Sequence, residues 1–120
     1  MNNMAIYPGK PMTDTAGKPV HAHAGGLFFE NGIYYWYGEN KECTTGKNKI
    51  WTWGIRCYSS PDLYNWKDEG LIIAPEPDVP TSWLHPSRQM DRPHILYVSE
   101  TGKYVCWLKY SGKTEACFCI

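Results

Sequence analysis

The sequence predicts an all-β protein built from repeated antiparallel sheets. Strand-forming residues occur in short runs bounded by turn residues, and no stretch keeps the apolar spacing of an amphipathic helix. Six Trp and nine Tyr in 120 residues strengthen this prediction, because aromatic side chains are enriched in strands. A similar hairpin recurs further along the chain, which indicates that the sheets form an array.

Four strands are expected in a first sheet between about residues 23 and 73. Asn31-Gly32 lies between two runs of strand formers, and Asn-Gly in that setting is a strong hairpin signal. Pro61 and Asp62 predict a tight turn, because proline fixes φ and Asp can bond its own backbone. Trp66 is expected to pack within this sheet. The strand-forming runs are 27–29, 33–37, 50–58 and 71–73.

A second sheet is expected from about residue 91, after a proline-rich connection over 74–90. Glu100-Thr101-Gly102 repeats Glu30-Asn31-Gly32 at an offset of 70 residues, which favours propeller blades over unrelated hairpins. The second sheet shows three runs, and its last run reaches Ile120. We therefore expect residues 1–120 to be the N-terminal part of a larger propeller domain. Blade one would span about 23–73, and blade two, which is incomplete, would begin at about 91. Its runs are 93–98, 104–108 and 116–120.

Composition narrows the classes of function. Lys+Arg 12 balance Asp+Glu 12, whereas a nucleic-acid partner would call for a basic patch. No segment approaches the run of about 18 apolar residues that a membrane helix requires, so no membrane partner is expected. No signal peptide is visible at the start of the chain. Because the nucleotide-binding glycine motifs are also missing, we expect no cofactor.

The five cysteines lack the paired C-x-x-C spacing of a zinc ribbon. We interpret them mainly as buried thiols in strands, and we predict no metal site. They are Cys43, Cys57, Cys106, Cys117 and Cys119.

Several motifs resemble glycoside hydrolase family 43, and in particular its branch of exo-acting galactan 1,3-β-galactosidases. The segments 17–26 and 34–39 are similar to the first blade of that family. The segment 57–66, with Ser-Ser-Pro-Asp-Leu and a Trp three residues on, matches a signature shared by the wider furanosidase and glycosidase propellers. Asp91-Arg92-Pro93-His94, followed by 101–105, looks like the start of the second blade.

The resemblance implies a five-bladed propeller with its site at the central axis. Its members hydrolyse glycosidic bonds, mostly with inversion, which requires one carboxyl as acid and another as base. In most of the family the base is an Asp on the first strand of blade one, whereas this strand reads His21-Ala22-His23-Ala24-Gly25. The galactanase-like branch also lacks that Asp. The general acid is expected beyond Ile120, so the catalytic residues of this chain stay unknown.

The resemblance also implies a function, a partner and a location. The parent protein is expected to be an exo-acting hydrolase of β-1,3-galactan in plant-type polysaccharide, secreted or periplasmic, while the 120-residue chain alone is expected to be inactive. The expected partner is an oligo- or polysaccharide. The alternatives are an α-L-arabinofuranosidase or β-xylosidase, and a non-catalytic carbohydrate-binding propeller, which the missing Asp favours.

Four residues are predicted to bind substrate: His23, Glu39, Asp91 and Trp83. His23 shares a strand face with His21, so it could contact a sugar hydroxyl, form a structural hydrogen bond or join a metal site. Glu39 follows a glycine at a strand end, with a solvated loop carboxylate as the alternative. Asp91 opens the second blade, with an ion pair to Arg88 or Arg92 as the alternative. Trp83 lies in the proline-rich connection and could stack on a sugar ring.

Overall fold

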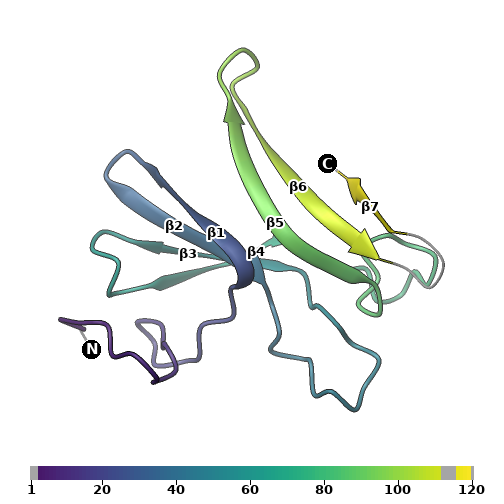
Figure 1. Cartoon of the computed structure of the whole chain (residues 1–120), viewed down its shortest axis with the longest axis horizontal. Helices are drawn as coiled ribbons and strands as arrows, with labels where there is room; N and C mark the ends of the chain where they lie inside the picture. Colours follow the sequence, from purple (N-terminus) through teal and green to yellow (C-terminus); the bar gives the residue numbers. More distant parts are fainter. Residues whose placement is uncertain (1–2, 112–115, 120) are drawn as a thin grey trace.

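The computed structural model describes residues 3–111 and 116–119 and places their strands in two antiparallel sheets (Figure 1). In that part of the chain no helix is present, so none could cross a membrane, and the predicted all-β class is confirmed. The first sheet has the order β1 (His23–Glu30), β2 (Ile33–Glu39), β3 (Ile55–Ser60) and β4 (Lys67–Ile73). The second has the order β5 (Gln89–Val98), β6 (Lys103–Ser111) and β7 (Ala116–Cys119).

Both predicted hairpins form. Asn31 and Gly32 join β1 to β2 with φ of 50° and 82°, the left-handed conformation that a two-residue hairpin turn requires at both positions. The β5–β6 turn ends on Gly102, which has φ of 64°. The left-handed backbone of these turns therefore explains Asn31, Gly32 and Gly102 from local geometry alone.

The third predicted strand, over 50–58, is wrong at its start. β3 begins only at Ile55, because Gly54 adopts φ of 79° and ends the extended conformation. Residues 50–54 instead close a long loop that begins after β2, and the N–H of Trp53 donates to the carbonyl of Asn40 at 2.9 Å. The alternating Trp and Ile residues that suggested a strand therefore belong mostly to a loop.

The cysteine prediction holds in part. Cys57 is buried in β3, and Cys106 is half-buried in β6. Cys43 lies in the loop after β2 and is half-buried, so the prediction of a buried strand thiol is wrong there. The side chains of Cys117 and Cys119 lie outside the described residues.

One face of the first sheet is covered by the segment that precedes it. Trp66 and Tyr58 are 3% and 1% exposed, and Trp36 meets Trp66 edge-on with ring centroids 5.3 Å apart. Met12 and Val20, from the N-terminal segment, pack against this cluster. Trp66 thus packs within the sheet as predicted.

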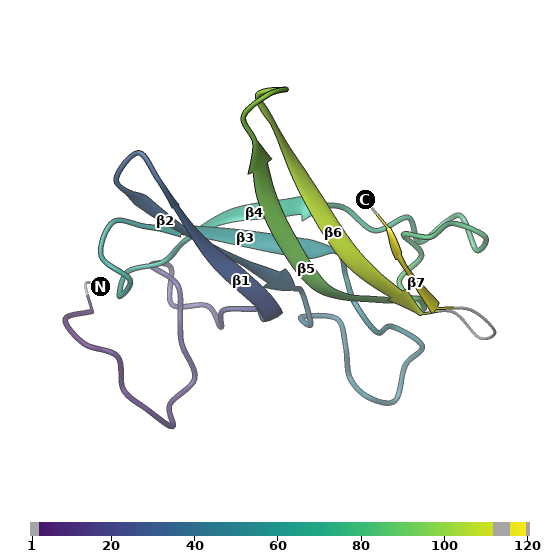
Figure 2. The same ribbon diagram turned by 45° about the horizontal axis from the view of Figure 1, so that its top comes forward.

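The other face of the first sheet packs against the second sheet. β5 lies beside β1 and β2, as Figures 1 and 2 show. Phe28 contacts Tyr104 with ring centroids 6.0 Å apart, and the backbone N–H of Ile95 donates to the hydroxyl of Tyr37 at 2.9 Å. The faces turned away from this junction expose large apolar side chains, among them Leu27, Phe29, Leu96 and Trp107.

The turn between β3 and β4 is held by Asp62. Its Oδ1 accepts hydrogen bonds from the N–H groups of Tyr64 and Asn65 at 2.9 and 2.8 Å, which confirms the predicted turn. The Asn65 side chain also donates to Asp62 Oδ2. These hydrogen bonds, that of the Asn65 side chain first, lower the pKa of Asp62 to about 2.

We expect this turn to make the stability of the chain depend on pH. The pKa of Asp62 is lower in the folded chain than its ordinary value of 3.8, so its stabilising contribution is present above pH 3.8 and is lost as pH falls toward 2. Asp62→Asn should remove that part of the pH dependence. Urea unfolding of both proteins at pH 5, 4, 3 and about 2 would show this. An equal loss of stability in both on acidification would contradict it.

Candidate functional site

The first strands of the two sheets carry matching β-bulges. The β1–β2 register shifts between His23 and Gly26, and the β5–β6 register shifts between Asp91 and His94. The residue after each break point, Ala24 or Arg92, has a positive φ of 48° or 53°. A bulge bends a strand and re-aims its side chains, so His23 and Asp91 occupy equivalent positions in the two sheets.

Glu39 is the last residue of β2 and lies opposite His23 in the register. Its carboxylate accepts a hydrogen bond from the bulged N–H of Arg92 at 3.1 Å and pairs with the Lys41 ammonium at 2.9 Å. Glu39 is only 5% exposed, so the alternative of a solvated loop carboxylate is wrong. Glu39 therefore joins the end of the first sheet to the start of the second.

Asp91 lies on the other side of this junction and is 9% exposed. Its Oδ1 accepts a hydrogen bond from the indole N–H of Trp51 at 2.7 Å, and its Oδ2 lies 3.7 Å from the Lys109 ammonium. Asp91 therefore forms an ion pair with Lys109 from the neighbouring strand, a cation other than the Arg88 and Arg92 that the sequence suggested.

Lys41 connects these two carboxylates through the loop between β2 and β3. Its ammonium binds Glu39, donates to the carbonyl of Trp51 at 2.8 Å and lies 4.2 Å from the centre of the Trp51 ring. Trp51 in turn binds Asp91. The result is a continuous polar chain, Glu39–Lys41–Trp51–Asp91, across the junction of the two sheets.

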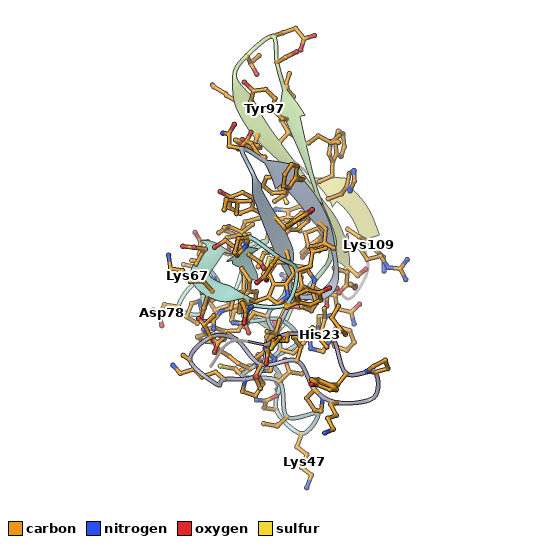
Figure 3. The ribbon with its side chains drawn as sticks, turned by 90° about the vertical axis from the view of Figure 1, so that its left-hand side faces the viewer. His23, Lys47, Lys67, Asp78, Tyr97 and Lys109 are labelled. Atoms are coloured by element: carbon orange, nitrogen blue, oxygen red, sulfur yellow. The ribbon has the colours of Figure 1, made fainter. Side chains whose placement is uncertain are left out.

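His23 adds an exposed imidazole beside Glu39, and Figure 3 shows it in the lower half of that view. Its ring stacks on that of His21 at 6.1 Å between centroids. Burial, and then the neighbouring His23, lower the pKa of His21. Within residues 3–111 and 116–119 no group of three His, Cys, Asp or Glu side chains could hold a metal ion, so the His pair has no third ligand there.

Trp83 lies apart from the other three. It sits in the connection between β4 and β5, is 51% exposed and packs on Tyr110 with ring centroids 4.2 Å apart. Tyr110 and Lys109 are adjacent in β6, so their side chains point to opposite faces of the sheet. Trp83 is therefore on the face opposite to the Asp91–Lys109 pair.

Comparison with known proteins identifies the group to which this arrangement belongs. No family model and no curated protein matches the chain. Among solved structures, a family 43 β-1,3-galactosidase solved with galactodeoxynojirimycin is 39% identical over 92% of this chain, with a TM-score of 0.77. An exo-β-1,3-galactanase from Clostridium thermocellum is 33% identical over 88%, with a TM-score of 0.73. An exo-β-1,3-galactanase from Phanerochaete chrysosporium, solved with galactose, is 27% identical over 90%, with a TM-score of 0.77.

The chain belongs to glycoside hydrolase family 43. The predicted fold class, part of a five-bladed β-propeller, is confirmed by the same matches. The chain spans 31%, 21% and 24% of the lengths of the three structures named above.

Two residues of the polar chain that joins Glu39 to Asp91 were missed by sequence reasoning. Lys41 and Trp51 both lie in the loop between β2 and β3. The Lys41 ammonium donates a hydrogen bond to the carbonyl of Trp51, ten positions further along the chain. In the sequence Trp51 alternates with Trp53 and Ile55, a pattern that predicts the strand over 50–58. The available signal was Gly54, since a glycine that interrupts an alternating run often marks a break in the strand.

Proposed function

We propose that the whole protein is an exo-acting glycoside hydrolase of β-1,3-galactan, and that this chain supplies part of its sugar-binding site. The observation that carries the proposal is the 39% identity to a β-1,3-galactosidase solved with galactodeoxynojirimycin, a galactose-like ligand. Further structures of the fungal enzyme, with one glutamate replaced by Ala or Gln, hold β-1,3-galactotriose. These neighbours favour a galactose-containing oligosaccharide as the partner of this chain.

In this proposal the carboxylates of Glu39 and Asp91 accept hydrogen bonds from sugar hydroxyls, and the imidazole of His23 donates or accepts one. Glu39 and Asp91 are each held by a lysine and by an N–H donor, so their carboxylate oxygens have fixed positions. Carboxylate oxygens in fixed positions can accept hydrogen bonds from the hydroxyl groups of a neutral sugar. A ligand without those hydroxyls would leave the oxygens unpaired and would bind less well. We keep Trp83 as a predicted stacking surface, although it lies on the opposite face of the second sheet.

The activity is tested on the protein encoded by the complete open reading frame that contains these residues. We expect release of galactose from β-1,3-galactan and from a chromogenic β-galactoside. Arabinosides and xylosides serve as parallel substrates, because release from them alone would favour the alternative specificity. Sugar binding without turnover of any substrate would favour the non-catalytic propeller, which the absence of an Asp from residues 21–25 supports. If the protein neither bound nor hydrolysed any of these sugars, both proposals would be contradicted.

Glu39→Gln is expected to weaken binding of galactose and β-1,3-galactobiose about tenfold. The substitution keeps the size of the side chain but removes the charge that pairs with Lys41 and strengthens hydrogen bonds from a sugar. Isothermal titration of the same expressed protein measures the change, and the near-UV circular dichroism spectrum checks its packing.

Glu100→Gln is the matched control for this measurement. Glu100 is exposed in the β5–β6 turn, and within the described residues its carboxylate accepts a hydrogen bond only from the adjacent Ser99 hydroxyl. Its substitution should leave sugar affinity unchanged. Wild-type affinity in Glu39→Gln, or an equal loss in both variants, would contradict the assigned role of Glu39.

A further inference from the structure

The ammonium group of Lys41 is enclosed by protein oxygens at the junction of the two sheets. Lys41 lies just after the end of β2, and its side chain is only 18% exposed. An ammonium carries three N–H donors and no acceptor. The ammonium binds Glu39 Oε2 at 2.9 Å, and it donates to the carbonyl of Trp51 at 2.8 Å and to the hydroxyl of Thr52 at 3.3 Å. The donors of Lys41 are therefore used within the protein, so its side chain is suited to hold other groups and not to bind a sugar.

Two of these contacts continue into the second sheet. The indole N–H of Trp51 donates to Asp91 Oδ1 at 2.7 Å. The hydroxyl of Thr52, which is fully buried, donates to the carbonyl of Met90 at 3.3 Å. Met90 and Asp91 are consecutive residues near the start of β5. Lys41 therefore supports the start of the second sheet through two neighbouring side chains of its own loop.

The Glu39 and Asp91 carboxylates can accept further hydrogen bonds after these contacts are made. The two oxygens of a carboxylate offer about four lone-pair sites. Glu39 Oε1 accepts a hydrogen bond from the backbone N–H of Arg92, and Oε2 is paired with Lys41. Asp91 Oδ1 accepts a hydrogen bond from the Trp51 indole. Both carboxylates are thus oriented by the protein, and each retains lone pairs for the hydroxyl groups of a sugar.

We propose that Lys41 is a positioning residue of the sugar site, which holds the Glu39 and Asp91 carboxylates in one arrangement without touching the sugar. It fixes Glu39 directly and Asp91 through Trp51. The inference rests on the proposed function for the identity of the ligand, and on the contacts of Lys41 for the positioning. A sugar that binds both carboxylates therefore depends on a lysine that it does not contact.

Removal of the ammonium should disturb both carboxylates. Glu39 is only 5% exposed, and a buried carboxylate that loses its cation is unfavourable, so it would turn toward water. Trp51 would lose the hydrogen bond to its carbonyl and the cation 4.2 Å from the centre of its ring. Its indole would then be held less firmly against Asp91. Lys41→Met keeps most of the length of the side chain and removes these interactions together.

A double-mutant cycle tests whether Lys41 acts through Glu39. Isothermal titration of the complete protein with β-1,3-galactobiose should show about tenfold weaker binding in Lys41→Met, as in Glu39→Gln. The double variant should fall well short of the loss of about a hundredfold that two independent tenfold contributions would give. Wild-type affinity in Lys41→Met would overturn the proposal. So would a loss of about a hundredfold in the double variant, because Lys41 would then act independently of Glu39.

Lys47→Met is the control for the loss of one positive charge. Lys47 is exposed in the same loop and lies low in the view of Figure 3. This variant should keep the wild-type affinity, and an equal loss in both methionine variants would contradict the specific role of Lys41. Should Lys41→Met fail to fold, Lys41→Met/Glu39→Gln is compared with Glu39→Gln instead, because this pair leaves no unpaired carboxylate at position 39.

The NMR signal of the Trp51 indole N–H separates failure of this inference from failure of the proposed function, because it is measured without sugar. A hydrogen bond to a carboxylate moves such a signal downfield, and Trp51→Phe identifies it by its loss. Lys41→Met should shift the signal upfield, whereas Lys47→Met should leave it in place. An unchanged signal in Lys41→Met would overturn the link from Lys41 to Asp91. If the wild-type protein bound no galactoside, the proposed function would fail, and the indole signal would still decide whether Lys41 positions Asp91.

Discussion

Gly25→Ala is expected to prevent the first sheet from forming in its native register. A Cβ at Gly25 would lie 1.8 Å from the carbonyl oxygen of Tyr37 and 2.6 Å from the Cα of Gly38. Both atoms belong to the backbone of β2, so no rotation of a side chain can relieve the contact. Strands β1 and β2 would have to separate at the bulge, and we expect a loss of about 3 kcal/mol or more in the free energy of unfolding.

Gly46→Ala is the control for this prediction. Gly46 has φ of 74°, yet a Cβ there meets no atom within 4 Å. Its substitution should therefore cost only about 1 kcal/mol, the penalty of a left-handed backbone for a residue with a side chain. Urea unfolding followed by tryptophan fluorescence measures both variants. Similar stability of the two alanine variants would show that the close approach of β1 and β2 does not hold in solution.

The turns are the part of the fold about which the sequence was most informative. Hairpin turns depend on the conformation of one or two adjacent residues, so Asn31-Gly32 could be located from the sequence. Asp62 could be assigned to its turn for the same reason, since all its backbone partners lie within three positions. The bulges of β1 and β5 left no such signal, because they depend on pairing with a second strand.

The candidate site could be predicted only in part, for a related physical reason. Glu39 and Asp91 were singled out at strand ends, but, apart from Lys41 beside Glu39, their partners come from distant parts of the chain. The N–H of Arg92 reaches Glu39 across 53 positions, and the indole of Trp51 reaches Asp91 across 40. No local pattern encodes such contacts. They arise because the two sheets pack together, which brings the end of β2 to the start of β5.

Trp83 shows what the register of the sheet adds to a prediction from composition. The position of Trp83 in a proline-rich loop predicts an exposed stacking surface, and Trp83 is 51% exposed. Its ring, however, already packs on Tyr110, on the face of the second sheet opposite to Lys109. Aromatic composition could identify the class of ligand, whereas the side of the sheet on which each ring lies follows from the register.

Trp66→Ala should destabilise the chain by about 3–5 kcal/mol, the range for removal of a large aromatic side chain from a core. Trp66 is 3% exposed, its indole N–H donates to the carbonyl of Leu63 at 3.1 Å, and its ring meets Trp36 edge-on. The alanine variant would leave a cavity between the first sheet and the N-terminal segment that covers it. It would also remove the hydrogen bond from the Trp66 indole to Leu63 in the β3–β4 turn.

Trp83→Ala removes the same side chain from a half-exposed position and is the matched control. Its loss should be about 1 kcal/mol, since much of the ring is already in water. Thermal unfolding followed by circular dichroism compares both variants with the wild-type chain. Because small domains are stable by only about 5–15 kcal/mol, Trp66→Ala should lower the midpoint by many degrees or abolish the transition. Equal shifts for both variants would mean that the buried Trp36–Trp66 cluster is not the main core of the first sheet.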